Sequence, residues 1–155
     1  MMNRRLFVSL LASIVFAPQA RSESALNMTV FKDPNCGCCG AWVNHVRKAG
    51  LTVSVVENEA MDDVKQRYGV PEGLTSCHTA EIGDYIVEGH VPSAEIIRLL
   101  KERPVAKGLV VAGMPKNSPG MEMTGAPAEK YGVMLFFADK EPIEYAVYSG
   151  AVRIS

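Results

Sequence analysis

The pattern of apolar and polar positions predicts seven regular elements over residues 28–103. Short runs rich in β-branched and aromatic residues, each typical of a strand, lie at 28–32, 52–57, 79–82 and 85–88. Longer segments with apolar residues at helical spacing lie at 40–49, 60–68 and 92–103. Gly83 and Asp84 separate the last two strand-like runs, which favours a hairpin with a two-residue turn. The order β-α-β-α-β-β-α is that of thioredoxin-like folds, so we predict an α/β fold with a central mixed sheet flanked by helices.

The chain after residue 104 is predicted to extend this core. A short apolar segment at 108–113 is followed by residues 115–127, which are rich in Gly, Pro and Met and show no periodicity. We predict a long loop there, and long loops inside a compact domain are often functional. The segments 133–137 and 143–148 are strand-like and are predicted to pair as an extra β-hairpin.

The N-terminus has the pattern of a secretory signal peptide. Two arginines precede residues 6–17, an uncharged and mostly apolar stretch that is too short to span a bilayer as a helix. Cleavage after Ser22 fits the small-residue rule, and the exact cleavage site stays open. We therefore predict a signal peptide over 1–22 and a single domain over 23–155. An uncleaved membrane anchor is the alternative.

Composition and charge limit the classes of function. The chain has 155 residues, 48% of them hydrophobic, which suffices for one domain with a real core. A formal net charge of −1 and the lack of a Lys/Arg-rich run argue against nucleic-acid binding. No apolar run after the signal approaches membrane length, so we expect a soluble exported protein, periplasmic in a bacterium, with no stable membrane insertion after cleavage.

Three of the four cysteines lie in the motif CGCCG at 36–40, between a predicted strand and a predicted helix. Cys36 and Cys39 form a C-x-x-C pair at a helix N-terminus, where the unpaired N–H groups and the dipole favour a thiolate. Cys38 lies inside the pair; a two-thiol redox pair does not need it, whereas a metal centre can use it. Two structural disulfides are the alternative for an exported chain. Cysteines this close together would, however, close tiny loops of little stabilising value.

Three further residues are candidate partners of the motif. Cys77 precedes the third predicted strand, near the place where thioredoxin-like folds carry a cis-proline beside the C-x-x-C pair, so we expect it to face the cluster. His90 lies in a loop that returns toward the same end of the sheet. His78 adjoins Cys77, and neighbours on a strand point to opposite faces, so both can contribute only if the backbone is irregular there. We interpret His45, in the middle of its helix, as structural or solvent-facing.

Met114, Met121 and Met123 lie in the long Gly/Pro-rich loop. Thioether sulfur is a soft ligand suited to Cu(I), although methionines also fill gaps in cores. We expect residues 113–123 to cover the cysteine cluster as a lid, with Met114 and Met121 contributing to a metal site.

The identity of the metal follows from the donor set. Four cysteines suit zinc or iron–sulfur centres by number alone. Structural zinc sites usually use two separated pairs, and export disfavours iron–sulfur assembly. Soft sulfur ligands with Met and His nearby favour copper. Because closely spaced thiolates can bridge Cu(I) ions, we expect several copper ions per chain to be feasible.

Several segments together resemble the CopG-type periplasmic copper-resistance proteins, a thioredoxin-like family. The matching segments are CGCCG at 36–40 with Trp42, SCHTA at 76–80, VEGHVP at 87–92, GMP at 113–115 and SPGME at 118–122. The resemblance implies that Cys36, Cys38, Cys39 and Cys77 hold copper. It also implies a role in copper resistance and interconversion of Cu(I) and Cu(II), as in a copper oxidoreductase. A periplasmic copper exporter or chaperone is the implied partner.

Two other functions stay open at this point. A thiol–disulfide oxidoreductase would use Cys36 as the nucleophile and Cys39 as the resolving thiol. The extra Cys38 and the missing cis-proline argue against it. A non-catalytic module would use its cysteines only for structural disulfides.

Overall fold

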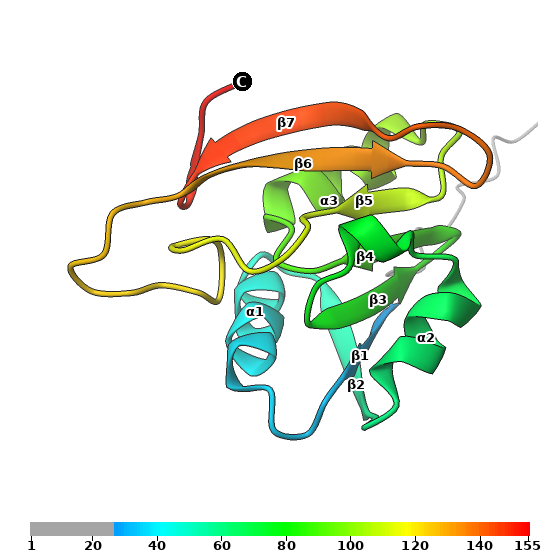
Figure 1. The fold of residues 1–155 in the computed structure, drawn as a ribbon, viewed down its shortest axis with the longest axis horizontal. Coiled ribbons are helices and arrows are strands. Elements are labelled where there is room, and N and C mark those ends of the chain that lie inside the picture. The colour runs from blue at the N-terminus through cyan, green and yellow to red at the C-terminus, as the bar shows by residue number, and fades with distance from the viewer. Residues whose placement is uncertain (1–26) are drawn as a thin grey trace, which may run out of the picture.

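The structure is a computed structural model that describes residues 27–155, and the predicted signal peptide lies outside this range. Within these residues the chain forms an eight-stranded mixed sheet flanked by helices (Figure 1). The strands are β1 (Asn27–Lys32), β2 (Thr52–Glu57), β3 (His78–Ile82), β4 (Tyr85–Glu88), β5 (Gly108–Val110), β6 (Lys130–Phe136), β7 (Ile143–Ser149) and β8 (Val152–Arg153). The helices are α1 (Gly37–Lys48), α2 (Met61–Tyr68), the 3-10 turn η1 (Glu72–Leu74) and α3 (Ser93–Glu102). The predicted α/β class is confirmed.

The predicted order of the first seven elements is also confirmed. The sheet runs β2-β1-β3-β4-β5-β6-β7-β8, with β1 parallel to β2 and antiparallel to β3. Gly83 has a positive φ of 58° in the two-residue turn between β3 and β4, as the hairpin pattern predicted. Helix α1 begins at Gly37, three residues before the predicted start at 40. The sequence prediction placed the start too late because Gly37 and Gly40, both in the first turn, are poor helix formers.

The C-terminal part widens the sheet. β5 pairs in parallel with β4, and β6 and β7 pair as the predicted antiparallel hairpin. The short β8 was not predicted; it pairs with β7 after a turn at Gly150, where φ is 57°. The long loop between β5 and β6 projects beside α1 and not beside α2 (Figure 1).

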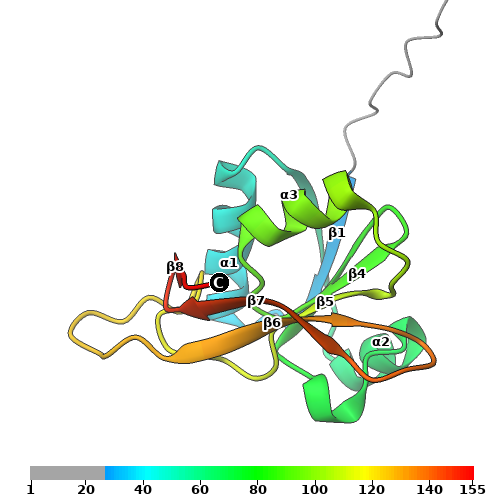
Figure 2. The ribbon, with the colours of Figure 1, turned by 90° about the horizontal axis from the view of Figure 1, so that it is seen from above.

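Helices cover both faces of the sheet. Figure 2 shows α1 and α3 on one face and α2 on the other. The larger apolar cluster lies under α1 and α3 and includes Trp42, Val46, Ile96 and Leu99, all fully buried. The indole N–H of Trp42 donates to the carbonyl of Val91 at 2.9 Å. This bond ties the first turns of α1 to the segment that enters α3, so it steadies the end of the sheet where the cysteines lie.

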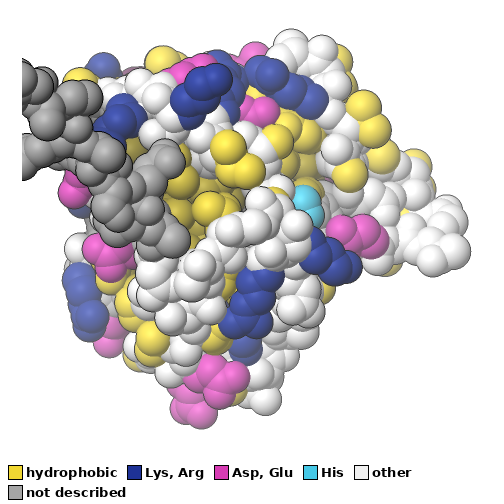
Figure 3. Space-filling view, turned by 180° about the vertical axis from the view of Figure 1, so that it is seen from behind, with side chains coloured by type: hydrophobic (Ala, Val, Ile, Leu, Met, Phe, Trp, Pro, Cys, Tyr) yellow, Lys and Arg dark blue, Asp and Glu magenta, His cyan; other side chains and the backbone are white. Residues whose placement is uncertain are grey.

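Helix length and surface charge describe the outside of the domain. Among residues 27–155, no helix is long and apolar enough to cross a membrane. On the face drawn in Figure 3, Lys and Arg side chains are interspersed with Asp and Glu.

Candidate metal centre

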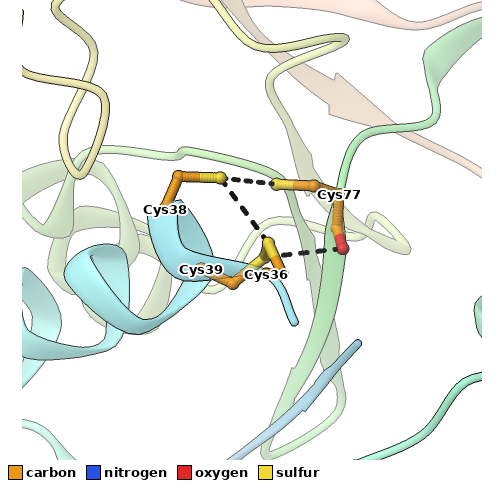
Figure 4. Close-up of side chains that lie close together, drawn as sticks. All are labelled: Cys36, Cys38, Cys39 and Cys77. Carbon is orange, nitrogen blue, oxygen red and sulfur yellow. Dashed lines mark hydrogen bonds between the residues drawn. A yellow bond between two sulfur atoms is a disulfide. The ribbon is translucent and has the colours of Figure 1, made fainter. Parts of the chain in front are cut away.

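The topology brings all four cysteines together. Cys36 is the N-cap of α1, Cys38 and Cys39 lie in its first turn, and Cys77 precedes β3. In the antiparallel pairing of β1 with β3, Lys32 lies opposite His78, so β3 begins where β1 ends. The four sulfur atoms consequently lie within 4.8 Å of one another (Figure 4). The expectation that Cys77 faces the C-x-C-C motif agrees with this geometry.

The cluster contains one disulfide and two thiols. Cys36 and Cys39 are joined by a disulfide bond, and Cys38 and Cys77 are free. The Cys38 sulfur lies 3.5 Å from the Cys36 sulfur and 3.9 Å from the Cys77 sulfur. Cys39 is fully buried, while the other three cysteines are partly exposed. An incoming metal ion or thiol therefore reaches Cys36, Cys38 and Cys77 before Cys39.

Two buried histidines add nitrogen atoms beside Cys77. His90 Nε2 lies 3.0 Å from the Cys77 sulfur, and His78 Nδ1 lies 3.4 Å from it. His90 Nδ1 lies 2.8 Å from the carbonyl oxygen of Pro119; because a carbonyl only accepts, Nδ1 carries the proton and Nε2 keeps a free lone pair. Metal-binding histidines are commonly oriented by such a bond to the other ring nitrogen.

His78 is fully buried, and its Nε2 has no hydrogen-bond partner among the described residues. It is the first residue of β3, whereas Cys77 lies before the strand. The rule that neighbouring side chains on a strand point to opposite faces therefore does not apply to Cys77 and His78. This irregular backbone lets both side chains lie at the same site. A buried polar atom without a partner is rare in proteins and is a place where a ligand or ion can be expected.

Burial sets the protonation of the site in the absence of metal. Desolvation lowers the pKa of His78 well below its usual range and also lowers the pKa of His90. Desolvation, followed by the nearby Cys38 thiol, raises the pKa of Cys77 to about 12. The metal-free site thus favours neutral imidazoles and a neutral Cys77 thiol. A bound cation would reverse the balance at the thiol because it stabilises the thiolate.

A buried carboxylate holds the segment that carries Cys77 and His78. Glu88 is fully buried, and its Oε1 accepts hydrogen bonds from the Ser76 backbone N–H and the Lys65 ammonium, both at 2.7 Å. Its Oε2 accepts from the Thr79 hydroxyl at 2.6 Å. Ser76 and Thr79 flank the Cys77-His78 dipeptide, so one side chain anchors the chain on both sides. Sequence reasoning missed this role, although a lone charge ending the apolar strand β4 was a signal.

The long loop contacts the site through its backbone. Besides the Pro119 carbonyl, Gly120 packs against the start of α1: a Cβ there would lie 2.6 Å from the Trp42 nitrogen and 2.9 Å from the Cys38 carbonyl oxygen. Met114 and Met123 are 54% and 49% exposed, and Met121 is partly buried. Part of the predicted lid therefore lies against the site. Ligation by Met114 and Met121 stays a prediction.

His45 lies apart from this cluster. It is half-buried, and its Nε2 accepts a hydrogen bond of 3.1 Å from the backbone N–H of Ser93 at the start of α3. This agrees with the structural role expected for it, because the bond joins α1 to α3.

Comparison with known proteins gives a consistent result. A family described as "Protein of unknown function, DUF411" matches residues 74–121, which include Cys77, His90 and most of the loop. Two solved structures, "Copper resistance protein copG- Form 1" and "Form 2", are 40% identical to this chain with a TM-score of 0.75. They cover 81% and 79% of this chain and 99% and 98% of their own. No functionally curated protein matches the chain.

Proposed function

Because the chain belongs to the CopG family of copper-resistance proteins, we propose that it binds copper at Cys36, Cys38, Cys39 and Cys77 and thereby limits free copper. The observation that carries the proposal is the convergence of four sulfur atoms within 4.8 Å. Thiolate sulfur is the preferred ligand of Cu(I) among protein side chains. Cys38 and Cys77 come together although they lie almost forty positions apart in the sequence. A structural disulfide within the CGCCG motif alone would not require Cys77 to lie there.

The full ligand set needs reduction of the Cys36–Cys39 disulfide, since a cysteine binds the metal as a thiolate. Four thiolates so close together can bridge metal ions, which supports more than one Cu(I) per chain. His90 offers the free lone pair of Nε2 toward Cys77, and His78 offers Nδ1. Met114 and Met121 would complete the site as the loop closes.

The same residues support interconversion of Cu(I) and Cu(II). When the Cys36/Cys39 dithiol gives two electrons to two Cu(II) ions, the products are two Cu(I) ions, one disulfide and two protons. The reverse reaction oxidises two Cu(I) ions and restores the dithiol. Imidazole nitrogen suits copper in both oxidation states, whereas thiolates favour Cu(I). A redox-active pair beside mixed sulfur and nitrogen donors is therefore suited to a copper oxidoreductase.

Anaerobic titration of the reduced protein with Cu(I), in competition with a chromogenic chelator, tests copper binding. We expect tight binding by the wild type and a large loss in the Cys36→Ser/Cys39→Ser double variant. Metal analysis of the isolated complex gives the number of ions. Binding that is weak, or equal in the two proteins, would refute the proposal. Asn44→Ala, an exposed change on α1, serves as the control.

We place the protein in the periplasm, where an exporter or copper chaperone would exchange copper with it. The pattern of a signal peptide over 1–22 supports this address. Mass spectrometry of the protein from a periplasmic extract should give the mass of a chain that begins near residue 23. A full-length mass in the membrane fraction would contradict it.

A second candidate is a thiol–disulfide oxidoreductase, favoured by the Cys36–Cys39 disulfide at the N-terminus of α1. Two features weaken it: Cys38 lies between the pair, and no cis peptide bond occurs among residues 27–155. An insulin-reduction assay with metal-free protein distinguishes the two functions, because fast turnover without copper would favour this second one. Two free thiols in the cluster likewise weaken a purely structural role for the cysteines.

A further inference from the structure

We propose that Cys38 and Cys77 form a second disulfide when Cu(II) is in excess, and that this bond expels Cu(I) by removing the last thiolates of the site. The inference rests on the proposed copper function and adds a release step to it. With only the Cys36–Cys39 disulfide, the site still keeps two cysteine thiolate ligands. With both disulfides it keeps none, so the number of disulfides decides whether copper stays bound.

The geometry favours this second bond. The Cys38 and Cys77 sulfur atoms are 3.9 Å apart, and their side chains point toward one another (Figure 4). A disulfide needs a separation of about 2.05 Å, so the sulfur atoms must approach by roughly 2 Å. Rotation of two partly exposed side chains can supply that movement. Cys77 lies just before β3, so its side chain can turn without breaking a strand pairing.

A competing reaction has a clear structural disadvantage. Cys38 also lies 3.5 Å from Cys36, and its thiolate can attack that sulfur to form a Cys36–Cys38 disulfide with release of Cys39. That exchange moves no electrons and leaves the thiol of Cys39, which is fully buried. It would also link two residues only two positions apart at the start of a helix, where such a loop is strained. The bond between Cys38 and Cys77 leaves the Cys36–Cys39 disulfide in place and adds a second one.

The chemistry balances with Cu(II) as the oxidant. Two Cu(II) ions each take one electron, the Cys38 and Cys77 thiols lose two protons, and one sulfur–sulfur bond forms. The products are two Cu(I) ions, the second disulfide and two protons. Only nitrogen donors of His78 and His90 and the thioethers of the loop then remain, and Cu(I) loses its preferred thiolate ligands. The four thiols of the fully reduced cluster can therefore give four electrons to Cu(II), two from each pair of cysteines.

Electron counting under anaerobic conditions tests the proposal. The protein is fully reduced, freed of reductant and exposed to excess Cu(II); a chromogenic chelator then counts Cu(I), and alkylation with mass spectrometry counts the remaining thiols. Formation of each disulfide releases two electrons, so two disulfides predict four Cu(I) ions per wild-type chain and loss of all four thiols. Cys38→Ser and Cys77→Ser should each give two Cu(I) ions and keep one alkylatable thiol.

The double variant Cys36→Ser/Cys39→Ser isolates the second pair. It should yield two Cu(I) ions and a tryptic peptide pair joined through Cys38 and Cys77 within one chain. Thiols that stay alkylatable, links between chains, or a Cys36–Cys38 bond in the wild type would overturn the proposal. Circular dichroism of each variant checks that it is folded, and a metal-free oxidant such as diamide tests the geometry without copper.

Failure of this inference is distinguishable from failure of copper binding. If the reduced wild type binds Cu(I) tightly but the peptide map lacks the Cys38–Cys77 link, only the release step is wrong. If the link forms but the reduced protein does not retain Cu(I), the copper function is wrong and the release step falls with it.

Discussion

The Cys77-His78 dipeptide lies between two groups of polar side chains, the hydrogen-bond network of Glu88 and the candidate metal centre. The two groups differ in how many of their polar atoms have hydrogen-bond partners. On one side, both oxygens of Glu88 accept hydrogen bonds from Lys65, Ser76 and Thr79. On the other side, His78 Nε2 has no hydrogen-bond partner among residues 27–155, and the Cys38 and Cys77 thiols face one another at 3.9 Å without a covalent bond. Glu88 and His78 are both fully buried, so the difference between these two side chains comes from pairing and not from burial.

The comparison separates a scaffold from a site. A saturated buried network has nothing left to offer a ligand, and it rigidifies the chain around it. An undersatisfied one carries a free-energy cost that a bound ion can relieve. The candidate metal centre lies next to the Glu88 network, so the rigid network can hold Cys77 and His78 in place.

The largest effect is expected from breaking the saturated cluster. Glu88→Gln leaves the buried Lys65 ammonium without its counter-ion, which should lower the free energy of unfolding by about 3–5 kcal/mol. Denaturant titration measures this, and Cu(I) competition should show weaker binding because Cys77 and His78 lose their anchor. Glu102→Gln removes an exposed partner of Arg98 instead and should change little. Equal effects of the two changes would contradict the scaffold role.

The contact between loop and helix is expected to come next. Gly120→Ala places a methyl group 2.6 Å from the Trp42 nitrogen at a φ of +84°. Gly125→Ala has a similar φ of +77° but open space, so it isolates the cost of backbone strain. We expect Gly120→Ala to lower stability by about 1–3 kcal/mol more than Gly125→Ala. Weaker binding of Cu(I) should accompany it, since the Pro119 carbonyl that orients His90 moves. Equal melting temperatures would count against close packing of the loop.

Replacing His78, whose Nε2 has no hydrogen-bond partner among residues 27–155, should separate stability from binding. His78→Phe removes a buried polar atom that has no partner, so the metal-free protein should keep its stability or gain up to about 1–3 kcal/mol. Copper retention should fall in the same variant, because a nitrogen donor beside Cys77 is gone. Thermal unfolding of metal-free and copper-loaded protein measures both. A large loss of stability without copper would mean that His78 belongs to the scaffold instead.

Acid should destabilise the metal-free protein through the same histidine. Burial lowers the pKa of His78, so below pH of about 6.5 the unfolded chain takes up a proton that the folded chain does not. Stability then falls with decreasing pH, at up to about 1.4 kcal/mol per pH unit for one histidine. Denaturant titrations between pH 7.5 and 5.5 should show this slope, and His78→Phe should reduce it. A wild-type stability that is constant or rises on acidification would be inconsistent with a neutral buried imidazole.

The smallest effect is expected from the loop thioethers. Met114→Ala/Met121→Ala should weaken Cu(I) retention by less than about tenfold, equal to 1.4 kcal/mol, and leave the fold intact. Met123→Ala is the matched control, since Met123 and Met114 are similarly exposed. Chelator competition measures the retention. Identical retention in wild type and double variant would remove the methionines from the site.

Several features of the protein follow from the sequence alone because their causes are local. The strand at 52–57 and the hairpin from 79 to 88 are encoded by β-branched runs and a Gly-first turn, so they need no knowledge of distant partners. The CGCCG motif and its position before a helix are likewise local. The resemblance to copper-resistance proteins rests on such segments, and the solved relatives agree with it.

Other features were decided only when the chain folded. The pairing of Lys32 with His78 puts Cys77 beside the cluster, and strand register depends on contacts that no short window of sequence contains. The pairing of β3 with β4, in which Thr79 lies opposite Glu88, lets Glu88 reach both Ser76 and Thr79. The path of the long loop presents the Pro119 carbonyl to His90. The residue types in the sequence determine which ligand atoms the site can use. The distances between those atoms, their burial and their hydrogen-bond partners arise from long-range packing of the sheet.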